Sequence, residues 1–70
     1  MNGKWNMKRL SWRALNDVLT SKTEDEVLEL LNQERAQFKR VAVLQRLHQR
    51  YCALRDARER REILSEATHP

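Results

Sequence analysis

The sequence has very few of the residues that interrupt helices. It contains one glycine, Gly3, and one proline, Pro70, and both lie near the ends of the chain. A glycine-rich phosphate-binding loop is therefore excluded, whereas long helices are permitted. No apolar run approaches the ~20 residues that a membrane-spanning helix needs, and no apolar segment follows the basic N-terminus as in a signal peptide. We therefore expect a soluble helical protein without a membrane partner.

Cysteine and histidine are equally scarce. Cys52 is the only cysteine, so a disulfide within one chain is impossible, and a lone thiol suits a reducing cytoplasm. His48 lies four residues before Cys52 and would share its helix face, but two ligands do not complete a zinc site. We expect no metal and no cofactor. A 70-residue chain buries only roughly 60 % of its unfolded surface, so we expect support from a partner chain: a homodimer, or a monomer that tightens on its target.

Charge is distributed unevenly along the chain, whose net charge is +4. The charged residues within 1–13 are all basic, those within 14–34 are mostly acidic, and those within 35–70 are again mainly basic. Two explanations remain open. An acidic helix can lie against a basic helix of the same chain, or the basic residues can form an exposed surface for nucleic acid or an acidic protein.

The clearest local motif is the start of a helix at Glu24. The segment Thr23-Glu24-Asp25-Glu26 has the pattern of a capping box, and three acidic side chains favour the positive end of the helix dipole. This predicts a helix over about 24–36. A shorter helix is predicted over about 12–20, with Ser11 as its N-cap. Trp12 and Leu15 are expected to face the core.

A third helix is predicted over about 40–66, because apolar residues recur there at three- and four-residue intervals. This stripe consists of Val41, Leu44, Leu47, Tyr51 and Leu54. A continuous helix from Glu24 to Ser65 remains open, but its coiled-coil pattern is not held through residues 33–37. We therefore favour a turn near 34–40 and an antiparallel helical hairpin. The predicted class is all-α, with the short N-terminal helix covering one side.

The predicted third helix is longer than its partner, so its last turns have no apolar stripe. Ile63 and Leu64 fall on a different face, and these turns either project into solvent, pack on the first helix or meet another chain. In terms of domains, we expect a flexible basic arm at 1–10, a single helical domain at 11–67 and a frayed tail at 68–70.

Nothing in the chain resembles an active site. The acidic residues 24–29 are explained by capping, and His48 is expected on a helix surface. Three helices of this size do not readily form the concave pocket that catalysis requires. We therefore expect neither enzymatic activity nor a small-molecule substrate.

Two classes of binding function remain. In the first, the protein binds another protein, because Trp and Arg are enriched at interface hot spots. The residues expected to bind a protein partner are Trp5, Trp12, Arg55, Arg58 and Arg61. In the alternative, a nucleic-acid-binding accessory protein, clustered positive charge on the third helix contacts phosphates. Its residues, expected to turn away from the apolar stripe, are Lys39, Arg46, Arg50 and Arg60.

The layout of residues 11–64 resembles small helical proteins that are commonly encoded by tailed phages and have no assigned activity. The similar elements are Trp12-x-x-Leu15, the segment from Thr23 to Arg35, and the segment from Val43 to Arg60. The resemblance implies that the protein is located in the bacterial cytoplasm. It implies either that the protein binds a host protein and inhibits or modulates it, or that it assists phage DNA metabolism. Such proteins often have a glycine near the position of Gln37, which this chain lacks.

Overall fold

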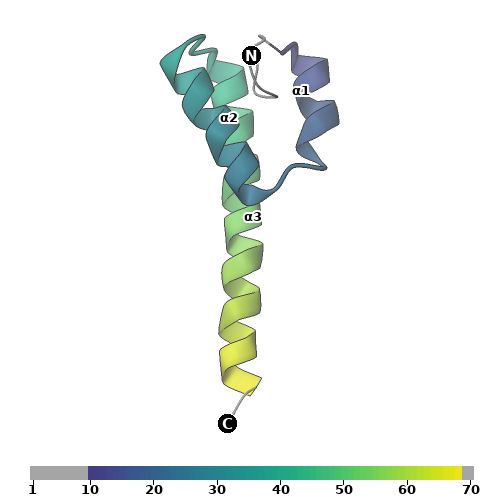
Figure 1. Ribbon diagram of the computed structural model, residues 1–70, viewed down its shortest axis with the longest axis vertical. Coiled ribbons are helices and arrows are strands. Elements are labelled where there is room, and N and C mark those ends of the chain that lie inside the picture. The colour runs from purple at the N-terminus through teal and green to yellow at the C-terminus, as the bar shows by residue number, and fades with distance from the viewer. Residues whose placement is uncertain (1–9, 69–70) are drawn as a thin grey trace, which may run out of the picture.

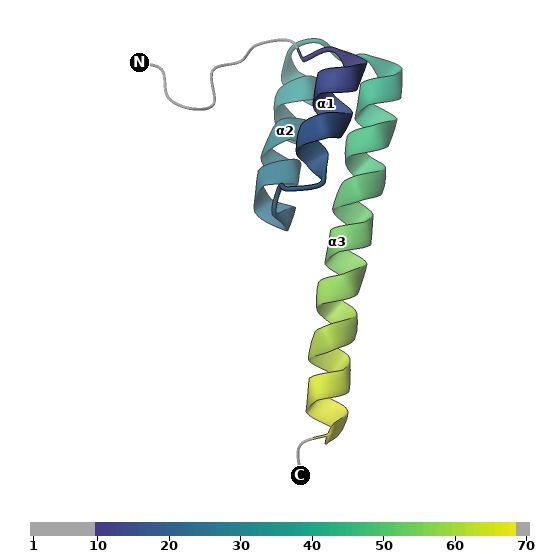
Figure 2. The same ribbon diagram turned by 90° about the vertical axis from the view of Figure 1, so that its right-hand side faces the viewer.

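The computed structural model describes residues 10–68, and within this range the chain forms three helices. They are α1 (Trp12–Leu19), α2 (Glu24–Ala36) and α3 (Val41–Thr68). The all-α class is confirmed, as is the predicted order of a short helix followed by two longer ones. The helices α2 and α3 lie side by side as an antiparallel pair, α1 packs beside them, and the C-terminal half of α3 extends beyond both (Figures 1 and 2).

Side-chain caps define where α1 and α2 begin. The Ser11 hydroxyl accepts a hydrogen bond from the amide of Ala14 at 3.1 Å. At α2 the predicted capping box is present. The Thr23 hydroxyl accepts from the Glu26 amide at 3.2 Å, and the Glu26 carboxylate accepts from the Thr23 amide at 2.9 Å. These bonds satisfy amides that would otherwise lack partners in the first turn, so the sequence itself specifies both starts.

The turn between α2 and α3 is made without glycine. Lys39 adopts a left-handed backbone conformation with φ of 55°, which usually favours glycine because it places Cβ close to the following carbonyl. The amide of Lys39 donates to the carbonyl of Glu34 at 2.8 Å. The predicted turn near 34–40 is confirmed, and Lys39 occupies the position where a glycine is easiest to accommodate.

The core lies at the end of the molecule where all three helices meet. Each helix contributes two buried apolar side chains, which are Leu15, Leu19, Val27, Leu31, Val43 and Leu47. Partly buried residues surround this cluster, including the predicted contacts Leu28 and Leu44. The core therefore sits between the α2–α3 pair and α1, and it occupies only the N-terminal half of α3.

Two predicted core positions are wrong. Val41 is 68 % exposed, and Val43 takes its place in the core. Two residues correspond to about 200° around a helix, so one of the two valines must face away. Trp12 is 51 % exposed, and Leu19 joins Leu15 as the core contribution of α1. The rest of the predicted stripe faces inward as expected.

The ends of the described range refine the predicted boundaries. Residues 1–9, including Trp5, lie outside it, so the predicted arm is described only at Leu10. That residue packs against the core. The helix α3 continues through Thr68, two residues beyond its predicted end. None of the helices in this part of the chain is both long enough and apolar enough to cross a membrane.

Candidate functional site

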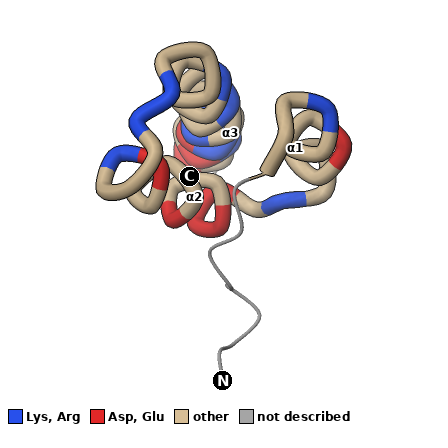
Figure 3. Tube along the Cα trace, turned by 90° about the horizontal axis from the view of Figure 1, so that it is seen from above, with Lys and Arg blue, Asp and Glu red and all other residues tan. Residues whose placement is uncertain are grey.

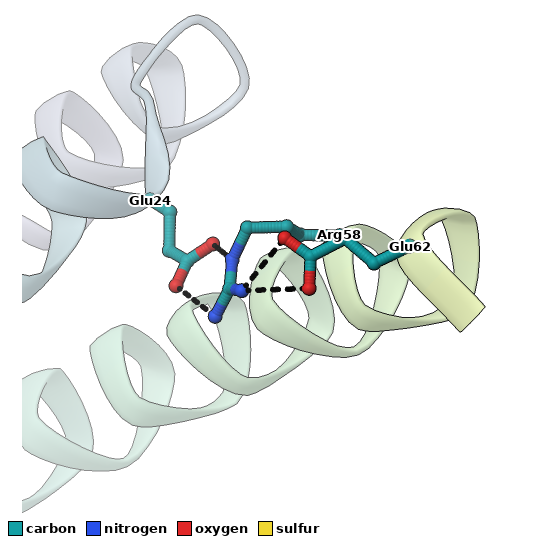
Figure 4. Close-up of polar contacts among 3 residues, drawn as sticks. All are labelled: Glu24, Arg58 and Glu62. Atoms are coloured by element: carbon teal, nitrogen blue, oxygen red, sulfur yellow. Dashed lines mark hydrogen bonds and ion pairs between the residues drawn. The ribbon is translucent and has the colours of Figure 1, made fainter. Parts of the chain in front are cut away.

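Arg58 of α3 links the two long helices at the point where α2 begins (Figure 4). Its guanidinium binds the Glu24 carboxylate through two hydrogen bonds, from Nε to Oε1 at 2.8 Å and from Nη2 to Oε2 at 3.2 Å. It also reaches Glu62, one turn further along α3, at 3.3 Å. Arg58, expected to contact a partner protein, is therefore occupied largely by carboxylates of its own chain.

These contacts change how the paired groups titrate. Hydrogen bonds from Arg58 lower the pKa of Glu24 below its ordinary value; partial burial opposes this, and the charges of Arg58, Arg55 and Arg61 add to the lowering. The same pairing raises the pKa of Arg58, through Glu24 first and Glu62 second. Both groups therefore remain charged at neutral pH, and the acidic start of α2 meets a basic segment of α3.

The two neighbouring arginines from the same predicted set differ in their surroundings. Arg55 is half-buried, with its guanidinium carbon 5.7 Å from the centre of the Tyr51 ring, within the range of a cation–π contact. Its Nε is shielded from solvent and has no hydrogen-bond partner among the described residues. Arg61 is exposed. Of the three arginines, only Arg58 binds Glu24 directly, while the charges of Arg55 and Arg61 act on it from a greater distance.

An ion pair joins the acidic helix α2 to the basic helix α3. Acidic positions gather on α2, and basic positions run along the side of α3 that faces α1 (Figure 3). One ion pair between α2 and α3, Glu24 with Arg58, agrees with the internal complementarity considered from the sequence, and a second, Glu34 with Arg40, lies across the turn between them. The uneven charge distribution is therefore partly used within the chain.

The proposed phosphate-binding residues do not share the outward face that was predicted for them. Arg46 is half-buried, and its Nε donates to the side-chain oxygen of Asn16 in α1 at 2.7 Å. Arg50 is also half-buried, and its Nε has no hydrogen-bond partner among the described residues. Lys39 lies in the turn before α3, and Arg60 lies on the far half of α3; both are exposed. Arg46 and Arg50 are therefore only partly turned away from the apolar stripe, and α1 reaches Arg46 through Asn16.

Trp12 stands at the edge of a shallow surface hollow formed by α1 and α3. The other residues that line the hollow are Ala42, Gln45, Arg46 and Gln49. Arg46 is held in place from both sides, because it donates to Asn16 at 2.7 Å and to the Gln49 side-chain oxygen at 3.3 Å. A half-exposed indole therefore lies beside polar groups that are already oriented. We refer to these five lining residues as the Trp12 surface.

The second exposed apolar feature is the projecting end of α3. Every residue from 59 to 68 is exposed, and Ile63 and Leu64 are 62 % and 58 % exposed. Together with three charged side chains they line another shallow hollow, whose members are Asp56, Glu59, Arg60, Ile63 and Leu64. Of the three arrangements considered from the sequence, the structure shows the one in which these turns project (Figure 1).

No metal site is formed by the residues that the structure describes. The thiol of Cys52 lies 3.5 Å from Nε2 of His48, as their spacing along a helix predicts. Within residues 10–68, no group of three or more His, Cys, Asp or Glu side chains is arranged to hold a metal ion. The His48–Cys52 contact is therefore a contact between neighbours on one helix face.

Sequence reasoning did not identify the best-anchored polar pair, Glu34 and Arg40. Glu34 is 5 % exposed and accepts two hydrogen bonds from the Arg40 guanidinium and one from its backbone amide. Arg40 in turn donates to the Leu10 carbonyl at 2.6 Å, and its pairing with Glu34 raises its pKa. The only indication of this pair in the sequence is that an acidic and a basic residue, Glu34 and Arg40, flank the predicted turn.

Comparison of the chain with protein-family models, with curated proteins and with solved structures found no match. The two exposed surfaces are therefore judged on their geometry and chemistry.

Proposed function

We propose that this protein is a non-enzymatic protein-binding module that uses the Trp12 surface as its contact site. The observation that carries the proposal is the exposure of Trp12, a large apolar side chain of α1 that is 51 % exposed. Burying an indole on a partner removes a large apolar area from water, and tryptophan is among the residues that dominate binding energy at interfaces.

The polar surroundings of Trp12 support the proposal. Arg46 is held by Asn16 and Gln49, so its guanidinium is positioned before a partner arrives. A positioned side chain loses less conformational entropy on binding than a free one. Gln45 is exposed beside it and offers both a donor and an acceptor. An apolar anchor with an oriented polar rim is the usual composition of a protein interface.

The proposal also names the class of protein to which the partner belongs. The resemblance to small phage-encoded proteins favours a protein of the bacterial host cytoplasm, which this protein would inhibit or modulate. That part rests on the resemblance alone. We also propose that the protein self-associates, through the projecting end of α3.

The proposal is tested by capture from a bacterial lysate with the immobilised protein. The lysate is treated with nuclease, and capture is compared at low and moderate salt for the wild-type protein and for Trp12→Ala. We expect one stoichiometric host protein that survives nuclease and salt and is lost with Trp12→Ala. An apolar-anchored complex tolerates salt because screening acts mainly on exposed charges.

The matched control is Val41→Ala. Val41 is 68 % exposed near the same end of the molecule and does not line the hollow, so its truncation should leave capture unchanged. Circular dichroism of each variant establishes that the helices persist. Equal capture by wild-type protein and Trp12→Ala, or capture lost equally with Val41→Ala, would remove the Trp12 surface from consideration.

Nucleic-acid binding is the second candidate, favoured by the basic side of α3 that faces α1 (Figure 3). Arg46 lies beside Trp12, and an exposed ring next to a cation also suits a stacked base. If the protein binds nucleic acid, the capture experiment should recover nucleic acid from the lysate. Binding should then fall steeply as the salt concentration rises, because bound counterions are released. Arg50→Glu and Arg60→Glu would then weaken binding as strongly as Trp12→Ala, whereas a protein complex centred on Trp12 would retain most of its affinity.

A further inference from the structure

The C-terminal half of α3 is a separate surface, and it does not depend on the role of Trp12. Glu24, at the very start of α2, pairs with Arg58 of α3. Beyond it α3 continues for ten exposed residues, 59–68. These residues bury no face against the rest of the described chain, whereas most helical stability in proteins comes from the packing of one face.

The exposed side of this half-helix lies opposite Arg58. At about 100° per residue, Asp56, Arg60, Ile63 and Leu64 fall within one sector whose centre is roughly opposite Arg58. Their common hollow agrees with this placement. The apolar pair therefore faces away from α2 and lies outside the existing core.

Two opposite charges on this face have no partner among residues 10–68. Neither Asp56 nor Arg60 takes part in an ion pair or a side-chain hydrogen bond with any residue that the structure describes. They are four residues apart, about 6 Å along the helix. Two small side chains, Ala53 and Ala57, are exposed on the adjoining strip. The face thus carries one acid, one base, two large apolar groups and two small ones.

We infer that the occupant of this face is a second copy of the same chain, packed antiparallel about a two-fold axis near the level of Arg58. In that arrangement Arg60 of each chain meets Asp56 of the other, so a single pairing generates two ion pairs. Leu64 of each chain lies over Ala53 of the other, where a small side chain lets the helices approach closely. The face is therefore complementary to itself, as an isologous interface requires.

Parallel packing is disfavoured by the same residues. It would place Arg60 beside Arg60 and Leu64 beside Leu64, which brings like charges together and leaves the alanines without a large neighbour. Like charges placed directly opposite each other across an interface are strongly unfavourable. The antiparallel seam is short compared with a standard interface of about 1,600 Å², so we expect a reversible dimer that dissociates in roughly the micromolar range.

Charge reversal tests both the partner and the orientation. Sedimentation equilibrium of the full chain at increasing concentration should show the mass rising from 8.4 kDa towards twice that value. Arg60→Asp and Asp56→Arg should each weaken the dimer by roughly ten-fold or more, because each variant places like charges opposite each other. Mixing the two single variants should restore association, since the charges are then complementary between chains.

The controls separate this inference from simple unfolding. Glu66→Arg reverses a charge on the same exposed segment but on a different face, and it should leave the dimer intact. Circular dichroism reports whether the helix persists in each variant. A protein that stays monomeric at all concentrations, a dimer unaffected by Arg60→Asp, or a mixture that fails to associate would each overturn the inference. Sedimentation reports on Asp56 and Arg60, whereas capture reports on Trp12, so failure of one proposal is distinguished from failure of the other.

Discussion

Glu34 of α2 and Arg40, the residue before α3, are joined across the turn that connects the two long helices. The Arg40 Nε lies 2.8 Å from Glu34 Oε2, and the Arg40 backbone amide lies 3.0 Å from the same oxygen. One nearly buried carboxylate therefore satisfies both a guanidinium and an amide at the start of α3. The same guanidinium holds the Leu10 carbonyl, so this pair fixes the entry to α1 as well.

Replacing the carboxylate should destabilise the fold strongly. Glu34→Gln leaves Arg40 partly buried without its charged partner, and breaking a buried ion pair costs about 3–5 kcal/mol. Because a fifth of the Arg40 side chain is exposed, we expect the lower end, about 3 kcal/mol. Urea unfolding followed by circular dichroism measures the change. Glu29→Gln, an exposed position in the same helix, is the control, and equal stability of the two variants would contradict this role of Glu34.

At Lys39, by contrast, we expect one substitution to stabilise the fold, because the backbone there is in the left-handed conformation. Lys39→Gly should raise the free energy of unfolding by up to about 1 kcal/mol, because glycine has no Cβ to collide with the following carbonyl. Lys39→Val should lower it, since a β-branched residue is poorly accommodated there. Thermal unfolding of both variants tests the turn. A Gly variant that is less stable than the Val variant would show that the turn does not depend on this conformation.

Two apolar residues of α1 should respond very differently to truncation. Leu19 is fully buried, so Leu19→Ala should cost about 2–5 kcal/mol through lost burial and a residual cavity. Trp12 is half exposed, so Trp12→Ala should cost about 1 kcal/mol or less. Chemical denaturation distinguishes the two. Comparable losses would mean that Trp12 belongs to the core and not to a binding surface.

The pairing of Glu24 with Arg58 makes stability depend on pH. The pKa of Glu24 in the folded protein lies below its ordinary value of 4.5. As the pH falls, the unfolded chain therefore takes up this proton first, and the stabilising contribution, present above pH 4.5, is lost as the pH drops through the lowered pKa.

The Glu24→Gln variant isolates this effect. Denaturant unfolding at pH 7, 5, 4 and 3 is compared for the wild-type protein and the variant, so that other carboxylates largely cancel. We expect the difference in free energy of unfolding to be largest above pH 5 and to shrink in acid. A difference that stays constant or grows as the pH falls would contradict the pairing.

Local chemistry made much of the fold predictable. The caps at Ser11 and Thr23 depend on residues within three positions of each other, so sequence alone identifies them. Helical periodicity then located α3 and most of its buried stripe. Periodicity was less informative at helix starts, where Val41 and Val43 offer two alternative faces and only the angle of the turn selects one of them.

The features that required the structure join residues far apart in sequence. Glu24 and Arg58 are 34 residues apart, and Asn16 and Arg46 are 30 residues apart. Their contacts depend on how α1 packs against the hairpin, which the spacing of apolar residues does not specify. For the same reason Trp12 was expected in the core. Its size suggested burial, but the two leucines of α1 already fill the space beneath the helix.

The most direct test of the Trp12 surface is photocrosslinking from a single position in bacterial cells. A photoreactive amino acid replaces Gln45, which lines the hollow, and in a parallel strain replaces Glu29, which is exposed on α2 outside it. We predict a specific crosslink to one host protein from position 45, none from position 29, and loss of the crosslink when Trp12→Ala is added. Equal crosslinking from both positions, or a crosslink to nucleic acid alone, would contradict a protein-binding role for this surface.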